Sequence, residues 1–325
     1  MVRNFCIAAL IFIQVTTPLL SSAQIKSTPL NSPPAKNSAA TATATATNPN
    51  TLFEGYSKII LNGLHVGYTV LRYEFDPRKK QFQATYLVKT EEQGGNILES
   101  LKAVADQDLK PISYQYVSLI DKKPKTIDAI FNGQKMTGVM KEGKTSKKLI
   151  SDLPKGTGLA IFLYYLILRS PDGLKTETKY NYKAIAEEDA KVYDGVAIIG
   201  KEEKFNGLKA YKASNTFKDV NYTFYLTETG EALMTDTPAA NIKTILVANP
   251  QEAIAKFNVP TAILTNLFGD IPAGSSNAVT KTLNAEVRQH KGPPPTKREG
   301  IPPDPKIMIK GSPESNVDSK DSKGE

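Results

Sequence analysis

Residue types that carry much enzyme chemistry are scarce in this sequence, which has one cysteine, two histidines and no tryptophan. The cysteine, Cys6, lies in an apolar N-terminal segment that we expect to be removed. The remaining chain then has no thiol, which excludes disulfide scaffolding, thiol catalysis and cysteine-based zinc binding. His65 follows a turn and is expected to be a surface strand residue, and His290 lies in a Pro- and Lys-rich stretch. A paired-histidine metal site or a Ser-His-Asp site is therefore not expected.

Sequence motifs of catalysis are also missing. No G-x-S-x-G, Walker, Rossmann or H-E-x-x-H pattern occurs. The acidic run Glu187, Glu188 and Asp189 is the remaining candidate, but adjacent carboxylates on a strand point to opposite faces. We expect a solvated strand end there, and a carboxylate-dependent hydrolase stays a remote alternative. The sequence predicts a protein that is not an enzyme, with no cofactor, no catalytic residue and no metal site.

A concentrated positive charge is absent from the body of the chain, although the net charge is +8. Outside the first 36 residues and the segment from Arg288 onward, 30 basic and 27 acidic residues leave only +3. This is a mixed, solvated surface, so no nucleic-acid partner is expected. The lysine-rich run Lys141–Lys148 is interpreted as an exposed hairpin and loop, with contact to anionic lipid or polymer as the alternative.

The two ends of the chain differ from its middle in composition. Residues 1–23 combine Arg3, an apolar run from Phe5 to Ile13 and small residues at Ser21 and Ala23. This pattern predicts a cleaved signal peptide and export to the periplasm or beyond, with no membrane span in the mature chain, because spanning takes about 20 apolar residues. Residues 24–50 (Ala, Thr, Pro) and 272–325 (Pro, Lys) predict a disordered linker and a disordered tail. Residues 51–271 are left as a single β-rich domain.

Turn signals recur through that domain. Asn-Gly, the strongest short hairpin signal, occurs at Asn62, Asn132 and Asn206 between runs rich in β-branched and aromatic residues. We expect a mainly β fold of roughly ten strands with this spacing. The predicted architecture is a curved antiparallel meander, either a half-barrel or an open barrel.

The segment Asn62–Phe75 predicts a long, bent strand. Leu64, Val66, Tyr68 and Val70 alternate with His65, Gly67, Thr69, Leu71, Tyr73 and Phe75. The first set is apolar early and the second becomes apolar late. We expect the two ends to be buried on opposite faces, with Gly67 at a kink or a close contact.

One segment departs from the β pattern. Ten consecutive residues, Leu159–Leu168, are apolar and precede a Ser-Pro-Asp-Gly turn. We predict an internal helix capped by Thr157 that a curved sheet could wrap, with a fully buried strand as the competing assignment. A second helix is expected from Asn249, with Asn249 as its cap and Pro250 in its first turn.

A resemblance to known families rests on several features taken together: export, the absence of cysteine, the opening strand NGLHVGYTVLRYEF, the strand start QDLKPISYQY and the internal apolar helix. The body resembles uncharacterised periplasmic families whose fold is similar to the lipoprotein carriers LolA and LolB. The resemblance implies a half-barrel whose concave face, lidded by helices, holds an acyl chain. The hypothesis is an exported, non-enzymatic envelope protein that binds a lipid, an acylated protein or another envelope component. The alternative is a structural or interaction protein whose groove is permanently plugged and whose tails make the connections.

Tyrosine and the apolar helix supply the candidates for the groove wall. Tyrosine has an apolar face and a polar rim, which suits a partly wet groove, although it also suits ordinary strands. The predicted groove residues are Tyr68, Tyr73, Tyr86, Phe162, Tyr164, Tyr165 and Leu166.

Overall fold

The computed structural model describes residues 49–290. The predicted signal peptide, nearly all of the predicted linker and the last 35 residues, 291–325, lie outside them. Contacts divide the chain into two compact units, Met1–Glu286 and Val287–Glu325. The strands and the helices before residue 278 belong to the first unit, and the last helix begins in it.

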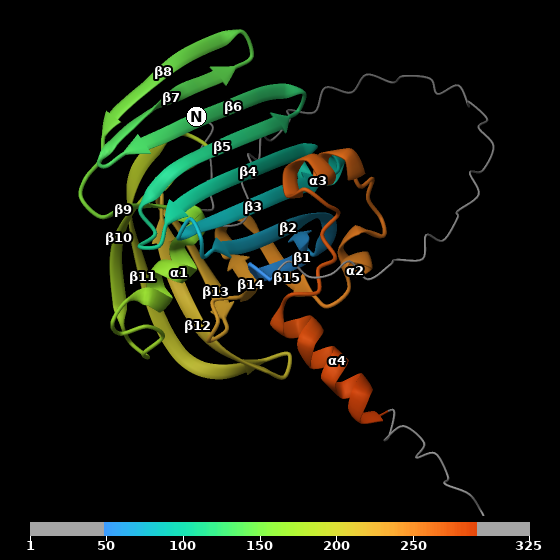
Figure 1. Ribbon diagram of the computed structural model, residues 1–325. Coiled ribbons are helices and arrows are strands. Elements are labelled where there is room, and N and C mark those ends of the chain that lie inside the picture. The colour runs from blue at the N-terminus through green and yellow to red at the C-terminus, as the bar shows by residue number, and fades with distance from the viewer. Residues whose placement is uncertain (1–48, 291–325) are drawn as a thin grey trace, which may run out of the picture. The chain divides into compact units, whose positions relative to one another are not determined.

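Fifteen strands between residues 49 and 290 form one sheet (Figure 1). Its order is β8-β7-β6-β5-β4-β3-β2-β1-β15-β14-β13-β12-β11-β10-β9. The strands are β1 (Thr51–Leu61), β2 (Leu64–Asp76), β3 (Gln81–Thr90), β4 (Ile97–Asp106), β5 (Pro111–Ile120), β6 (Lys123–Asn132), β7 (Lys135–Glu142), β8 (Thr145–Asp152), β9 (Thr157–Leu159), β10 (Lys179–Ala186), β11 (Lys191–Phe205), β12 (Leu208–Phe217), β13 (Val220–Leu226), β14 (Ala232–Thr237) and β15 (Ile242–Val247). Every pairing is antiparallel except that of β9 with β10. The predicted curved antiparallel meander is confirmed.

Short helices complete the described chain. They are α1 (Leu163–Arg169), α2 (Pro250–Ile254), α3 (Thr261–Phe268) and α4 (Ala278–His290), with single 3-10 turns η1 (Glu92–Gly94), η2 (Ala160–Phe162) and η3 (Pro238–Ala240). Figure 1 shows α1 on the concave side of the sheet and α2 and α3 on the opposite side. The predicted start of α2 is confirmed, because the Asn249 side chain accepts a hydrogen bond from the Gln251 N–H at 3.0 Å.

The Asn-Gly hairpins are all present, and two of them have the predicted turn. The φ angles are 50° at Asn62 and 80° at Gly63, and they are 48° at Asn206 and 81° at Gly207. Positive φ at both central residues matches a type I′ turn. Asn132 differs because it still pairs with Lys135 in the ladder. The two-residue turn there begins at Gly133, one position later than the pattern predicts.

The sheet has more strands than the roughly ten predicted, because polar and charged residues mask several of them. The hairpin β7–β8 is the clearest case, since its two strands contain four lysines and little β-branched sequence. It turns at Gly143, as the pattern KEGK predicts, and it is exposed along most of its length.

Strand β2 bends where Gly67 lies, as expected. The register against β1 shifts between the pairs Ile59–Gly67 and Ile60–His65, so Val66 forms a bulge. A Cβ on Gly67 would lie 2.2 Å from the Lys89 carbonyl oxygen, which makes this a close backbone contact. The bulge moves Val66 into the concave core, whereas Tyr68 packs on the convex side.

The apolar segment lies inside the curve of the sheet, but only part of it is α-helical. Leu159 is the last residue of β9 and pairs with Ile185 of β10, so the helix cannot begin there. A 3-10 turn follows, and α1 starts at Leu163. Thr157, the predicted cap, instead donates its hydroxyl to the Pro154 carbonyl at 2.7 Å. The helix prediction is therefore correct for Leu163–Leu168 and wrong for the residues before it.

Two helices cover the convex face of the central strands. Ala253 of α2 and Leu264 of α3 are fully buried and pack on a separate apolar cluster that contains Tyr68, Val70 and Leu87. His65 is half-buried here, with its ring 4.9 Å from that of Phe257 in an edge-on arrangement. The middle of the sheet is therefore packed on both faces, against the concave core on one side and against this convex cluster on the other.

The packed chain continues beyond Ile271, where the sequence predicts the domain to end. Tyr56 donates its hydroxyl to the Pro272 carbonyl at 3.0 Å, and the Gly274 N–H donates to Glu54. Asn277 is fully buried, and its amide donates to the Glu54 carbonyl oxygen at 3.0 Å. The proline-rich composition of the segment from residue 272 onward gives no indication of these contacts. The domain extends to the start of α4.

Candidate functional site

The middle of the concave face, where the sequence predicts a groove, is filled by side chains. The Tyr73 ring lies 4.9 Å from Tyr165 and 6.1 Å from Phe162, and Tyr164 lies 4.9 Å from Phe224. Tyr73 also donates its hydroxyl to the Ile161 carbonyl at 2.6 Å. The space left beside Tyr164 is about 10 Å³, roughly the minimum for one water molecule.

The predicted groove residues therefore divide into two groups. Tyr73, Tyr86, Phe162, Tyr164, Tyr165 and Leu166 belong to the concave core, and of these Leu166 alone is only half-buried. Tyr68 is on the other face, fully buried against the α2–α3 layer, because the bulge in β2 interrupts the alternation of side chains. None of the six concave residues borders a cavity large enough for a ligand among those found in the described chain.

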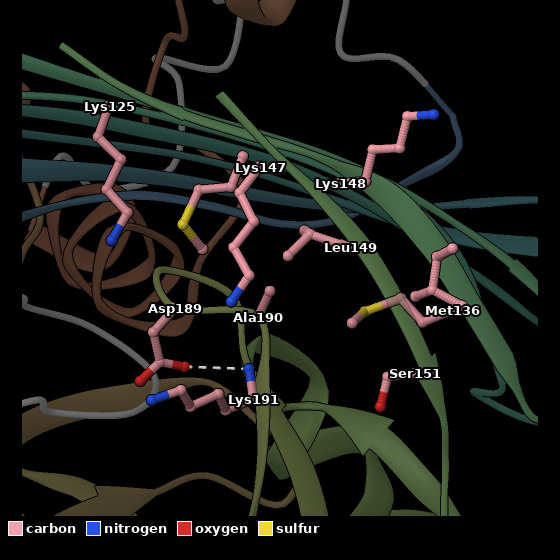
Figure 2. A pocket seen from close by; sticks show the side chains of 11 residues that line it. Lys125, Met136, Lys147, Lys148, Leu149, Ser151, Asp189, Ala190 and Lys191 are labelled. Carbon is pink, nitrogen blue, oxygen red and sulfur yellow. Dashed lines mark hydrogen bonds between the residues drawn. The ribbon is translucent and has the colours of Figure 1, made fainter. Parts of the chain in front are cut away.

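A cavity of about 410 Å³ lies at one end of the concave face, between strands β6–β8 and the turn that joins β10 to β11 (Figure 2). Its lining residues are Lys125, Met136, Met140, Lys147, Lys148, Leu149, Ile150, Ser151, Asp189, Ala190 and Lys191. Such a volume is within the range of about 300–1,000 Å³ found for small-molecule sites. The sequence analysis identified none of these residues as a groove candidate.

Strand pairing places the apolar part of this lining. Met140 of β7 pairs with Ile127 of β6 on one side and with Lys147 of β8 on the other, so the three side chains share one face. Two positions along, Gly138 pairs with Leu149. Met136 and Leu149 are buried and Met140 is half-buried, which gives the cavity an apolar floor. Met136 and Met140 lie four residues apart on β7, and this same-face spacing is the one signal that the sequence offered.

Lysines from three elements border the same cavity. Lys125 comes from β6, Lys147 from β8 and Lys191 from the start of β11. Between residues 49 and 290, none of the three ammonium groups forms an ion pair. Lys148 also borders the cavity, but in Figure 2 its side chain points away from that of Lys147.

The acidic turn opposite the lysines is not the solvated strand end that the sequence predicts. Glu187 and Glu188 are buried, at 2 % and 7 % exposure. Lys218 pairs with Glu188 and, at 2.7 Å, with Asp189. Asp189 also accepts hydrogen bonds from the Tyr193 hydroxyl at 2.8 Å and the Lys191 N–H at 3.1 Å. These contacts fold the turn inward against the sheet, which the local sequence does not reveal.

Buried carboxyls lie behind the turn. Glu187 accepts a hydrogen bond from the Ile161 N–H at 3.0 Å. Burial raises the pKa of Glu187 to about 8, although this hydrogen bond opposes the shift. Glu99, 1 % exposed on β4, has its pKa raised well above the ordinary value by burial and then by the charge of Glu188. Glu187 thus accepts a backbone N–H, while Glu188 and Asp189 pair with Lys218.

Two further features of the described residues bear on the site. No three His, Cys, Asp or Glu side chains between residues 49 and 290 are arranged to hold a metal ion. Over the same residues, no helix has both the length and the apolar character needed to cross a lipid bilayer.

Comparison with known proteins gives likenesses in fold alone. A β-barrel-like protein of the domain of unknown function DUF1849 from Brucella abortus is 15% identical over 60% of this chain and 96% of that one, with a TM-score of 0.41. A DUF1089 family protein from Pseudomonas aeruginosa is 13% identical over 54% of this chain and 90% of that one, with a TM-score of 0.35. No protein-family model matches the chain, and no curated protein matches its sequence. At these scores the two likenesses bear on neither a ligand nor an activity.

Proposed function

We propose that this chain is a non-enzymatic binding protein for a hydrophobic ligand, and that the ligand occupies the cavity between β6–β8 and the β10–β11 turn. The observation that carries the proposal is a cavity of about 410 Å³ with a floor formed by Met136, Met140 and Leu149. Methionine side chains are flexible and polarisable, which suits the binding of an apolar chain. Each buried CH₂ group of such a ligand would contribute about 0.8 kcal/mol.

The proposal moves the site from where the sequence predicts it. The resemblance implies binding in the middle of the concave face, where the structure has Phe162 and Tyr165 instead. The proposed cavity lies beside β8, which is an edge strand of the sheet, so a ligand would enter from that side. The predicted signal peptide makes export to the cell envelope part of the same proposal.

Methyl NMR on the whole chain tests the location. The sequence has five methionines, and ¹³C labelling of their methyl groups gives a reporter at Met136 and Met140 in the cavity and at Met234 on β14. Titration with dodecanoate should shift the signals of the first two and leave that of Met234 in place. No change in any signal, together with no lipid in solvent extracts of protein purified without detergent, would argue against the proposal.

A blocking substitution gives the matched control. Ser151 lies in the cavity lining and pairs with Met136, so Ser151→Trp should fill the space and abolish dodecanoate binding. Ile130, which is 64 % exposed on β6, borders none of the cavities described here. Ile130→Trp should bind as the unmodified chain does. Equal binding by the two variants would contradict the proposed location.

A second candidate function draws on the filled middle of the sheet. If the segment Ala160–Arg169 is a permanent plug, the protein can serve as a structural or interaction module whose ends reach a partner in the envelope. Deletion of residues 24–48 and 291–325 would then abolish envelope association and leave thermal stability unchanged. For the ligand-binding function, the same deletion should leave dodecanoate affinity unchanged.

A further inference from the structure

We propose that the ligand of this cavity carries an anionic head group, which Lys125, Lys147 and Lys191 bind while the apolar chain lies on the methionine floor. This inference rests on the proposed function and adds the chemical class of the ligand. Its first support is convergence, because the three lysines come from β6, β8 and β11 and border one space (Figure 2).

The acidic groups near the lysines do not neutralise them. Asp189 is the only acidic side chain in the lining, and it already pairs with Lys218 at 2.7 Å. Glu142 pairs across the ladder with Lys125 but forms no ion pair with it in the described chain, and Glu99 is buried beyond Lys125. Burial raises the pKa of Glu99 well above its ordinary value, which favours the uncharged form of this carboxyl. The cavity therefore has an excess of positive charge.

The arrangement of apolar and charged surfaces narrows the ligand further. Met140 and Lys147 are direct partners in the β7–β8 ladder, so apolar and cationic groups meet at the same position of the concave face. Like charges in one cavity repel each other, and an anion between them relieves that cost. A neutral amphiphile would leave this charge uncompensated, whereas a carboxylate or a phosphate would accept hydrogen bonds from the ammonium groups.

Four probes with a twelve-carbon chain test the head group, each used below its solubility limit and below any micelle-forming concentration. Isothermal titration should give measurable binding for dodecanoate and dodecyl phosphate, about tenfold weaker binding for dodecanol, and none for dodecyltrimethylammonium. The ratio of the two anions distinguishes a fatty acid from a phosphate lipid as the source. Dodecanol binding as tightly as dodecanoate would overturn the anionic assignment and leave the proposed function intact. No binding of any probe would overturn both.

Neighbouring lysines on β8 provide the matched variants. Lys147→Gln should weaken dodecanoate binding about tenfold, because it removes a charge that borders the floor. Lys148→Gln removes the same charge from the next residue, whose side chain points away, and should change the affinity less than twofold. Both lysines are exposed, so both variants should keep the thermal melting curve of the unmodified chain. Equal weakening by the two substitutions would show a diffuse charge effect and overturn the assignment of this site.

Discussion

Glu187 accepts a hydrogen bond from the backbone N–H of Ile161 at 3.0 Å, and this contact joins the β10–β11 turn to the segment that fills the concave face. The Ile161 carbonyl accepts a hydrogen bond from the Tyr73 hydroxyl at 2.6 Å, so this residue of the plug is held by strand β2 as well as by the β10–β11 turn. The carboxyl that makes this contact is buried, which links the packing of the plug to a titratable group.

The Glu187 pKa predicts a stability that falls as the pH rises. Burial raises this pKa from 4.5 to about 8, so between those values the folded chain holds a proton that the unfolded chain has released. The stability that Glu187 contributes is therefore fully present below about pH 4.5 and is lost as the pH rises to about 8. The loss is on the order of a few kcal/mol of unfolding free energy. Glu187→Gln keeps an acceptor for Ile161 without the charge. Urea unfolding should show that the variant is more stable than the unmodified chain at pH 8.5 and similar to it at pH 4.5.

The control for that prediction is an exposed glutamate. Glu203 on β11 is solvent-exposed, and Glu203→Gln should leave the pH dependence of stability unchanged. Glu99 contributes a residual slope in every variant because its pKa is also raised. Identical slopes for Glu187→Gln and the unmodified chain would show that Glu187 does not titrate in this way.

The apolar segment should behave as a plug. Phe162 is fully buried between Tyr73 and Phe82, and truncation to Ala should cost about 3–5 kcal/mol of unfolding free energy. Leu166 is half-buried, so Leu166→Ala should cost less. Chemical denaturation measures both. If Phe162→Ala melts like the unmodified chain but changes dodecanoate binding, the segment is a movable lid, since lids come from the less stable parts of a fold.

Local turn chemistry made much of the fold predictable. Asn62-Gly63 and Asn206-Gly207 set their hairpins through positive φ, which depends on those two residues alone. Side-chain alternation was less secure, because the bulge at Val66 moves Tyr68 to the opposite face from the one that a groove requires. The sequence near Tyr68 does not indicate which face of the sheet becomes the concave one.

The candidate site depends on contacts between distant segments and could not be predicted in this way. Met136 and Leu149 form the floor, but Asp189 and Lys191 reach it only because the sheet curves round. Glu187 is buried because Ile161 supplies a donor from another part of the chain. Neither fact follows from the residues around each position, which explains why the acidic turn was expected to be solvated.

The contacts beyond Ile271 predict where the chain tolerates truncation. Asn277 is fully buried. Its side-chain Oδ1 caps α4 by accepting the Thr280 N–H at 2.9 Å, and its side-chain NH₂ donates to the Glu54 carbonyl oxygen of β1. Removal of residues 272–325 should therefore lower the melting temperature by several degrees, whereas removal of residues 291–325 should not. Asn277→Ala removes the side-chain contacts of this residue by a single substitution and should lower the unfolding free energy by about 1–3 kcal/mol. Equal melting temperatures for the two truncations would place the end of the domain at Ile271.

The close backbone contact at Gly67 predicts that a single added methyl group disturbs the pairing of β2 with β3. A Cβ at this position would lie 2.2 Å from the Lys89 carbonyl oxygen and 2.8 Å from the Thr90 Cα. Both are backbone atoms, so rotation of a side chain cannot relieve the clash and the strands must separate. Gly67→Ala should cost about 2–3 kcal/mol or more in urea unfolding. Gly63 is the control, because a Cβ there meets nothing within 4 Å and the cost comes only from its φ of 80°, about 1 kcal/mol. A Gly67→Ala variant as stable as Gly63→Ala would mean that the β2 bulge can absorb the methyl group, and that the bend does not require glycine.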